Sequence, residues 1–180
     1  MISKINRKII ILTLFLSYSL WFFIPSARAS NGEVLFSNEA VTSSIIDGSL
    51  DNDEWFDAYH NIITLTGVEE ITPVDVYVKN DLGSLYIAFR IPDSSKSNLL
   101  ILRFEGEQEP WDAKKSRWDR EPWDMFWNGN SWENDTSTID VITVWGWYTD
   151  HWIVEWKIPL NSGDPYDMNV NAGETIKMGI

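Results

Sequence analysis

The sequence predicts an all-β protein with the architecture of an antiparallel β-sandwich. Apolar and polar side chains alternate over several short segments, which is typical of strands that bury one face. Glycine, proline, asparagine and aspartate residues separate these segments and favour turns. No stretch shows the i, i+3, i+4 apolar spacing of an amphipathic helix. About six to nine short strands are therefore expected in one domain.

The elements follow in order along the chain. Residues 74–91 predict a β-hairpin, because two alternating runs flank the turn sequence Asn-Asp-Leu-Gly-Ser at 80–84. Residues 98–105 are apolar on both sides and are expected to form a central strand. Residues 152–158 alternate again, with two tryptophans on the predicted inner face. A last strand begins at 175, and the chain stops within it, as expected either of a fragment or of an edge strand.

Residues 106–138 interrupt this pattern. They combine tryptophans with charges, glycine and proline, so they predict a long loop excursion with one short strand at 123–127. Long loops on a rigid sandwich commonly carry binding sites.

Nine of the eleven tryptophans lie between Trp111 and Trp156. The core of a single domain of this length needs fewer tryptophans. Flat indole rings are suited to flat ligands such as sugars and porphyrins. Trp152 and Trp156 are expected in the core. The rings expected around a ligand are those of the excursion, Trp123 and Trp127 among them, together with Trp145 and Trp147.

The first 29 residues predict a signal peptide. Basic residues precede the apolar run 9–24, and the small-x-small sequence at 27–29 fits a cleavage site. The alternative is an uncleaved anchor, for which the run is short. Cleavage leaves the domain 30–180 without a stable membrane span, exported to the periplasm, the extracellular space or the cell surface. It also changes the net charge from −13 to −17, because this segment carries four basic residues and no acid, and so a nucleic-acid partner is not expected.

The composition also limits the chemistry. The chain has no cysteine, which excludes disulfides, thiol catalysis, cysteine-bound zinc and covalent c-type haem attachment. No nucleophile–base arrangement is evident, and we expect no enzyme activity.

Two further groups are candidate metal sites. Asp47, Asp51 and Asp53 offer the hard oxygen ligands that Ca²⁺ prefers, although their spacing is not that of an EF-hand and an acidic turn is the alternative. Trp55, which follows them, is expected to plug one end of the sandwich. If the flat ligand is haem, Met125, Lys114 and Lys115 are candidate binding residues, and His151 is a second choice for the iron.

Three segments together resemble a known family. Residues 46–55 and 84–89 resemble sandwiches of the carbohydrate-binding family 9-like and DOMON-like group. The Pro-Leu-Asn-Ser-Gly-Asp-Pro-Tyr-Asp stretch within 156–167 resembles the haem-binding domain of the ethylbenzene dehydrogenase gamma subunit type, also described as cytochrome c-552/dimethyl sulfoxide reductase-like. The resemblance covers nearly all of the chain after residue 45.

The resemblance implies a β-sandwich that holds one haem b. Such a domain exchanges electrons with a molybdenum enzyme or another redox partner outside the cytoplasm. It further implies a methionine and a lysine as iron ligands, which correspond to Met125 and to Lys115 or Lys114.

Three functions stay open at this point. The first is an exported b-type haem domain for electron transfer. The second is a carbohydrate-binding module without haem, whose partner is a polysaccharide. The third is a structural or interaction domain whose aromatic residues are core, since a fold does not fix a function.

Overall fold

A computed structural model describes residues 34–66, 71–93, 99–105, 111–136, 139–171 and 174–180. The predicted signal peptide lies outside these ranges. Residues Glu33–Ile180 form one compact unit. In the part of the chain that is described, no helix is long and apolar enough to span a membrane.

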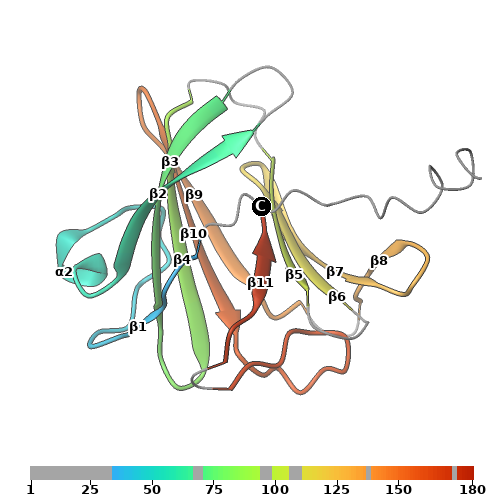
Figure 1. The fold of residues 1–180 in the computed structure, drawn as a ribbon. Coiled ribbons are helices and arrows are strands. Elements are labelled where there is room, and N and C mark those ends of the chain that lie inside the picture. The colour runs from blue at the N-terminus through green and yellow to red at the C-terminus, as the bar shows by residue number, and fades with distance from the viewer. Residues whose placement is uncertain (1–33, 67–70, 94–98, 106–110, 137–138, 172–173) are drawn as a thin grey trace, which may run out of the picture. The chain divides into compact units, whose positions relative to one another are not determined.

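The unit is an all-β sandwich of two sheets, as predicted (Figure 1). The first sheet has the order β1-β3-β4-β10-β9, with β2 also paired to β3. Its strands are β1 (Asn38–Glu39), β2 (Tyr59–Thr66), β3 (Ile71–Asn80), β4 (Ser84–Ile91), β9 (Ile142–Trp147) and β10 (Trp152–Pro159). The second sheet has the order β11-β5-β6-β7-β8. Its strands are β5 (Leu99–Glu105), β6 (Trp111–Arg117), β7 (Arg120–Trp127), β8 (Trp132–Asn134) and β11 (Lys177–Gly179).

Among the described strands, every pairing is antiparallel except the short contact of β1 with β3. The predicted hairpin is confirmed as β3 and β4. Asp81 closes its turn, because its Oδ1 atom accepts hydrogen bonds from the backbone N–H groups of Gly83 and Ser84. The last strand, β11, is an edge strand that pairs with β5.

The main core lies between the two sheets. Val74, Phe89 and Trp156 of the first sheet are fully buried in one apolar cluster with Leu102 and Phe104 of the second. Because apolar side chains of both sheets meet in this cluster, burial of these faces holds the sandwich together.

A second, smaller cluster covers the outer face of the first sheet. Trp55, in the single helical turn α2 (Asn52–Trp55), packs on Tyr86 and Ala88. The expectation that Trp55 plugs the end of the sandwich is therefore wrong. Because this cluster covers the outer face of the sheet, Glu155 and its neighbours on β10 are buried on both sides of the strand.

Strand β5 differs from its prediction in one respect. It lies between β11 and β6, as expected of an internal strand. Only one of its faces is fully buried, however, through Leu100, Leu102 and Phe104, while Arg103 is exposed on the other.

The predicted loop excursion is also wrong, except that its short strand at 123–127 lies within β7. Residues 111–134 form the three neighbouring strands β6, β7 and β8 of the second sheet, joined by short turns. The alternation was present in the sequence, but four tryptophans face outwards while Asp112, Lys114 and Asp124 face inwards, opposite to the usual pattern.

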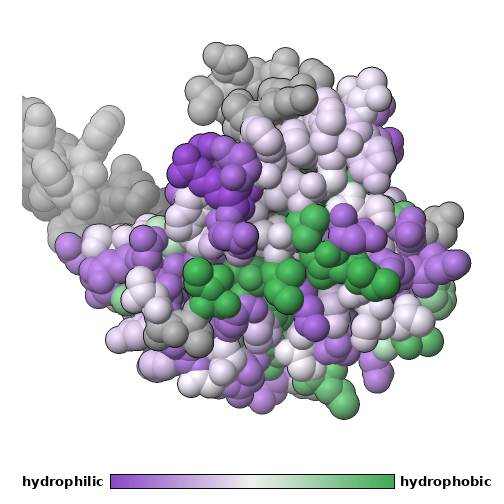
Figure 2. All heavy atoms as spheres, turned by 180° about the vertical axis from the view of Figure 1, so that it is seen from behind, coloured by the Kyte–Doolittle hydropathy of each residue, from purple (hydrophilic) through white to green (hydrophobic). Residues whose placement is uncertain are grey.

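The surface carries both apolar and hydrophilic residues. On the face turned away from the viewer of Figure 1, apolar residues form a narrow band among hydrophilic ones (Figure 2). Such a mixture is ordinary for a surface in contact with water.

Candidate functional site

The inner face of the second sheet carries an unusual buried charge. Asp112 and Lys114 of β6 and Asp124 of β7 all point between the sheets and are 3% exposed or less. Charged groups are rarely this deeply buried unless they are paired. Their neighbours explain how they are accommodated.

Lys114 is the centre of this cluster. Its Nζ atom lies 2.6 and 2.7 Å from the two carboxylate oxygens of Asp124 and 2.6 Å from Oδ1 of Asp167. Asp112 and Asp140 approach the same nitrogen at 3.3 and 3.4 Å. One ammonium group therefore faces four carboxylates, and we name these five residues the Lys114 cluster.

The imbalance shifts the pKa values of the cluster. Burial raises the pKa of Asp112 to about 6 and that of Asp124 to about 7, and repulsion from Asp167 adds to both, although Lys114 opposes the change. Burial also raises the pKa of Asp167. For Lys114, burial alone would lower the pKa, but the surrounding carboxylates raise it.

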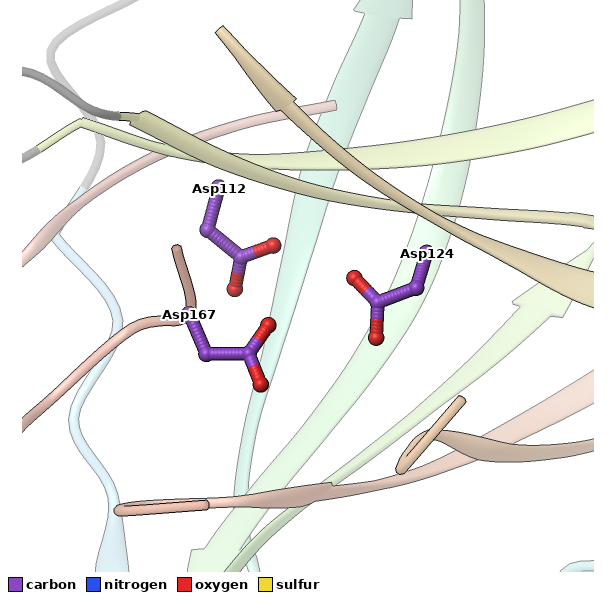
Figure 3. A group of neighbouring side chains, drawn as sticks. All are labelled: Asp112, Asp124 and Asp167. Atoms are coloured by element: carbon purple, nitrogen blue, oxygen red, sulfur yellow. The ribbon is translucent and has the colours of Figure 1, made fainter. Parts of the chain in front are cut away.

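Three of these carboxylates could also hold a metal ion. Asp112, Asp124 and Asp167 each offer an oxygen within 4.8 Å of the others, and their side chains converge (Figure 3). The Nζ atom of Lys114 already lies among these oxygens, however, and supplies the positive charge that an ion would bring. A cavity of about 110 Å³ adjoins Asp112 and Asp167.

The opposite, outer face of this sheet carries tryptophans. Trp111, Trp123 and Trp127 point outwards from β6 and β7, and Trp132 follows from β8. All four are half-buried, and we name them the outer tryptophan face. The rings of Trp111 and Trp127 stack with centroids 6.3 Å apart, and Trp132 lies 5.7 Å from Trp127.

A second group of tryptophans lies where β9 and β10 meet the β6–β7 turn. The ring of Trp152 contacts those of Trp145, Trp147 and Trp118 at centroid distances of 5.6, 4.6 and 6.3 Å. Trp152 is 3% exposed, whereas Trp118 and Trp147 are 43% and 37% exposed. We name these four residues the end tryptophans.

The end tryptophans join the two sheets. Trp145 belongs to β9 of the first sheet, and its indole N–H donates a 2.7 Å hydrogen bond to Oγ of Ser116 on β6 of the second. Trp118 lies in the turn between β6 and β7 and reaches Trp152 of β10. The site is therefore assembled from segments far apart in the sequence.

The predicted haem ligands are distributed over two faces. Met125 lies opposite Ala113 on the outer face of the second sheet, whereas Lys114 lies opposite Asp124 on the inner face. Lys114 and Met125 therefore cannot approach one iron atom, and the ammonium of Lys114 is already surrounded by carboxylates. Lys115 shares the outer face with Met125, and its Nζ atom lies 4.9 Å from the ring centroid of Trp123.

The other predicted ring residues are divided as well. Trp123 and Trp127 belong to the outer tryptophan face, and Trp145 and Trp147 to the end tryptophans. His151 stacks on Tyr148, with ring centroids 4.8 Å apart, next to the end tryptophans rather than beside Met125.

The described contacts of the acidic segment 47–53 are those of a turn. Oδ1 of Asp47 accepts hydrogen bonds from both the N–H and the hydroxyl of Ser49, which is turn chemistry. Asp51 precedes α2 without capping it through its side chain. Within the described ranges, no group of three acids that could share an ion includes Asp47, Asp51 or Asp53.

The Lys114 cluster was not foreseen from the sequence. The signal was present in the i, i+2 spacing of Asp112 and Lys114 and in Asp124 on the following strand, since alternate residues share a face. This spacing predicts a buried cluster only if it is already known which face of the strands is buried.

Comparisons with known proteins identify similar folds among solved structures. No family model matches the sequence, and no curated protein matches it. Two solved structures of a carbohydrate-binding module of family 9 from Caldicellulosiruptor kristjanssonii are similar in fold. The one in complex with cellotriose aligns with a TM-score of 0.50 and 17% identity, over 72% of this chain and 69% of that one. The one in complex with glucose gives 0.48 and 18% over the same shares. At this identity the likeness concerns the fold alone.

Proposed function

We propose that this chain is an exported carbohydrate-binding module and that the end tryptophans form its sugar site. The proposed role is binding, without catalysis. It acts outside the cytoplasm, as the predicted signal peptide implies.

One observation carries the proposal. Among the described tryptophans, Trp118 and Trp147 have the greatest exposure, and both contact the same buried ring, Trp152. Exposing large apolar rings forgoes the free energy of burying them, so two exposed rings around a third indicate a ligand surface. The hydrogen bond from Trp145 to Ser116 stabilises the position of this group before a ligand arrives.

The surroundings suit a sugar. Indole faces pack against the C–H groups of a pyranose ring, while polar neighbours bind its hydroxyl groups. Tyr148 and His151 stack beside Trp147, and the ion pair of Arg117 with Asp119 flanks Trp118. The similarity in fold to a module whose solved structure contains cellotriose supports the same ligand class.

Calorimetric titration of the mature domain with cellotriose and glucose tests the proposal. Replacing Trp118 or Trp147 by alanine should each weaken cellotriose binding about tenfold, the loss expected for one stacked ring. Trp132→Ala, on the outer tryptophan face, is the matched control and should leave cellotriose affinity unchanged. Absence of binding by the wild-type domain to any neutral glycan, or unchanged affinity in both end variants, would contradict the proposal.

Haem binding is the second candidate, because Met125 and Lys115 share the outer face with Trp123 and Trp127. A haem held there would serve electron transfer to a redox partner. Titration of the purified domain with haem would then give a Soret band and sharp bands on reduction, and Met125→Ala would shift them. A titration in which the spectrum remains that of free haem rules this candidate out.

A further inference from the structure

We propose that the outer tryptophan face is a second binding surface, and that its ligand is a polysaccharide chain bearing carboxylates, as uronic acids do. The inference rests on the proposed function only in taking a glycan as the ligand. The surface, its tryptophans and the charge of the ligand are different.

The inverted polarity of the second sheet is the first observation. In β6 and β7 the side chains of Asp112, Lys114 and Asp124 are buried, while Trp111 and Trp127 of the same strands face outwards. Burying several charges costs free energy, whereas burying indole rings is favourable. A sheet built for stability alone would have the opposite polarity, so the outward tryptophans indicate a binding role.

The geometry of the rings is the second observation. Trp132, Trp127 and Trp111 follow one another across three adjacent strands, with successive centroids 5.7 and 6.3 Å apart. This spacing is comparable to the length of one sugar residue in a chain. Trp123 lies four residues before Trp127 on β7, roughly 13 Å away along the strand. The face therefore offers ring surface over the length of several sugars.

The placement of cations is the third observation. Lys115 and Arg120 lie over the ring of Trp123 at 4.9 and 5.9 Å from its centroid, and Arg103 lies over Trp132 at 5.8 Å. A carboxylate on a sugar stacked beside these rings would find a cation within reach.

These cations are concentrated on one face. Among the described lysines and arginines that are not buried, Arg90 and Lys157 belong to the first sheet. The remainder lie on or beside the outer tryptophan face, and they are Arg103, Lys115, Arg117, Arg120 and Lys177. The described acids on the same strands that are not buried are Glu105, Glu121 and Glu133, and Asp119 pairs with Arg117.

The described side chains of this face thus include more cations than acids, whereas the whole chain has a net charge of −13. Charges farther apart than about 8 Å are largely screened at physiological salt. The net charge slows the approach of an anionic chain, while the cations beside the rings determine the contact. A polymer with both sugar rings and carboxylates fits this face better than one that offers only charge.

Calorimetry and affinity electrophoresis at physiological salt test this with polygalacturonate, its fully methyl-esterified form and poly-L-glutamate. Wild-type protein should bind polygalacturonate at least tenfold more tightly than the other two, since one lacks the charge and the other the rings. The double variant Arg103→Gln, Lys115→Gln should lose tenfold or more in affinity, and so should Trp127→Ala. Lys157→Gln removes a cation that lies 5.6 Å from the ring of Tyr86 on the first sheet and should change nothing.

Three results would overturn the inference: equal affinity for poly-L-glutamate, which indicates a surface selective for charge alone; equal affinity for the esterified polymer; or unchanged binding in the double variant. Thermal unfolding of each variant shows that it is folded. The two proposals fail separately, because Trp118→Ala and Trp147→Ala should lose cellotriose and keep polygalacturonate.

Discussion

Lys114 and Asp124 face each other across β6 and β7 on the inner side of the second sheet, with Nζ of the lysine 2.6 and 2.7 Å from the two carboxylate oxygens. Asp112, Asp140 and Asp167 surround the same ammonium group. Because taking each ion out of water costs several kcal/mol, the arrangement depends on the one cation at its centre.

Replacing Lys114 by methionine should therefore destabilise the fold strongly. The variant keeps the aliphatic volume but leaves the carboxylates without a buried counter-charge, and the expected loss is roughly 3–5 kcal/mol. Urea unfolding at neutral pH measures it. Lys115→Met, at the next position but on the outer face, should change the free energy of unfolding by less than about 1 kcal/mol. Similar losses in the two variants would show that the Lys114 cluster has no special role.

The free energy of unfolding should decrease as the pH rises from about 4 to about 7. The folded protein keeps protons on Asp112, with a pKa of about 6, and on Asp124, with a pKa of about 7, at pH values where the unfolded chain has released them. The midpoint of thermal unfolding should accordingly be higher at pH 5 than at pH 8. Asp57 and Asp81, whose pKa values are lowered, act in the opposite direction, with their effect at more acidic pH.

The variant Asp112→Asn distinguishes the contribution of the Lys114 cluster to this pH dependence from that of the remaining acids. The amide oxygen can still accept the hydrogen bond from the N–H of Met168, which Oδ2 of Asp112 accepts at 3.1 Å. The variant should gain stability at pH 8, by up to roughly 3 kcal/mol, and its unfolding should depend less on pH. A pH profile identical to that of the wild type would contradict the assignment.

Glu155→Gln should weaken the attachment of residues 47–55 to the first sheet. The carboxylate accepts hydrogen bonds from the N–H groups of Asp47 and Gly48, at 2.9 and 2.6 Å, and from the indole of Trp55 at 2.9 Å. A glutamine presents an N–H group to at least one of these donors, which should cost about 1–3 kcal/mol. Chemical denaturation measures the loss, and faster proteolysis at residues 47–55 would show where it acts.

Gly146→Ala should be among the most damaging small substitutions. A Cβ atom at residue 146 would lie 1.8 Å from the carbonyl oxygen of Gly48, and both positions are backbone that cannot move aside cheaply. Gly83→Ala is the control, since the nearest atom to its Cβ would be a side-chain oxygen of Asp81 at 3.7 Å. Equal midpoints of thermal unfolding in the two variants would show that the close approach at Gly146 is not required.

Where alternation coincided with the usual polarity, the sequence was sufficient. Val74 and Phe89 of the hairpin and Trp156 of β10 were expected on inner faces, and they lie there. It was insufficient for β6 and β7, because a strand's alternation shows that two faces differ but does not show which one is buried. The expectation that apolar side chains point inwards is wrong at Trp111 and Trp127, and of these two strands the sequence predicts only the part at 123–127.

The sequence by itself determined the class of the fold and the abundance of tryptophans, because both follow from local spacing and composition. The tertiary structure alone decided which tryptophans share a surface. Trp118 and Trp147 meet around Trp152 because two sheets pack together, and Lys114 lies apart from Met125 because neighbouring residues of a strand point to opposite faces. Such relationships depend on pairing between segments distant in the chain, on which local spacing carries no information.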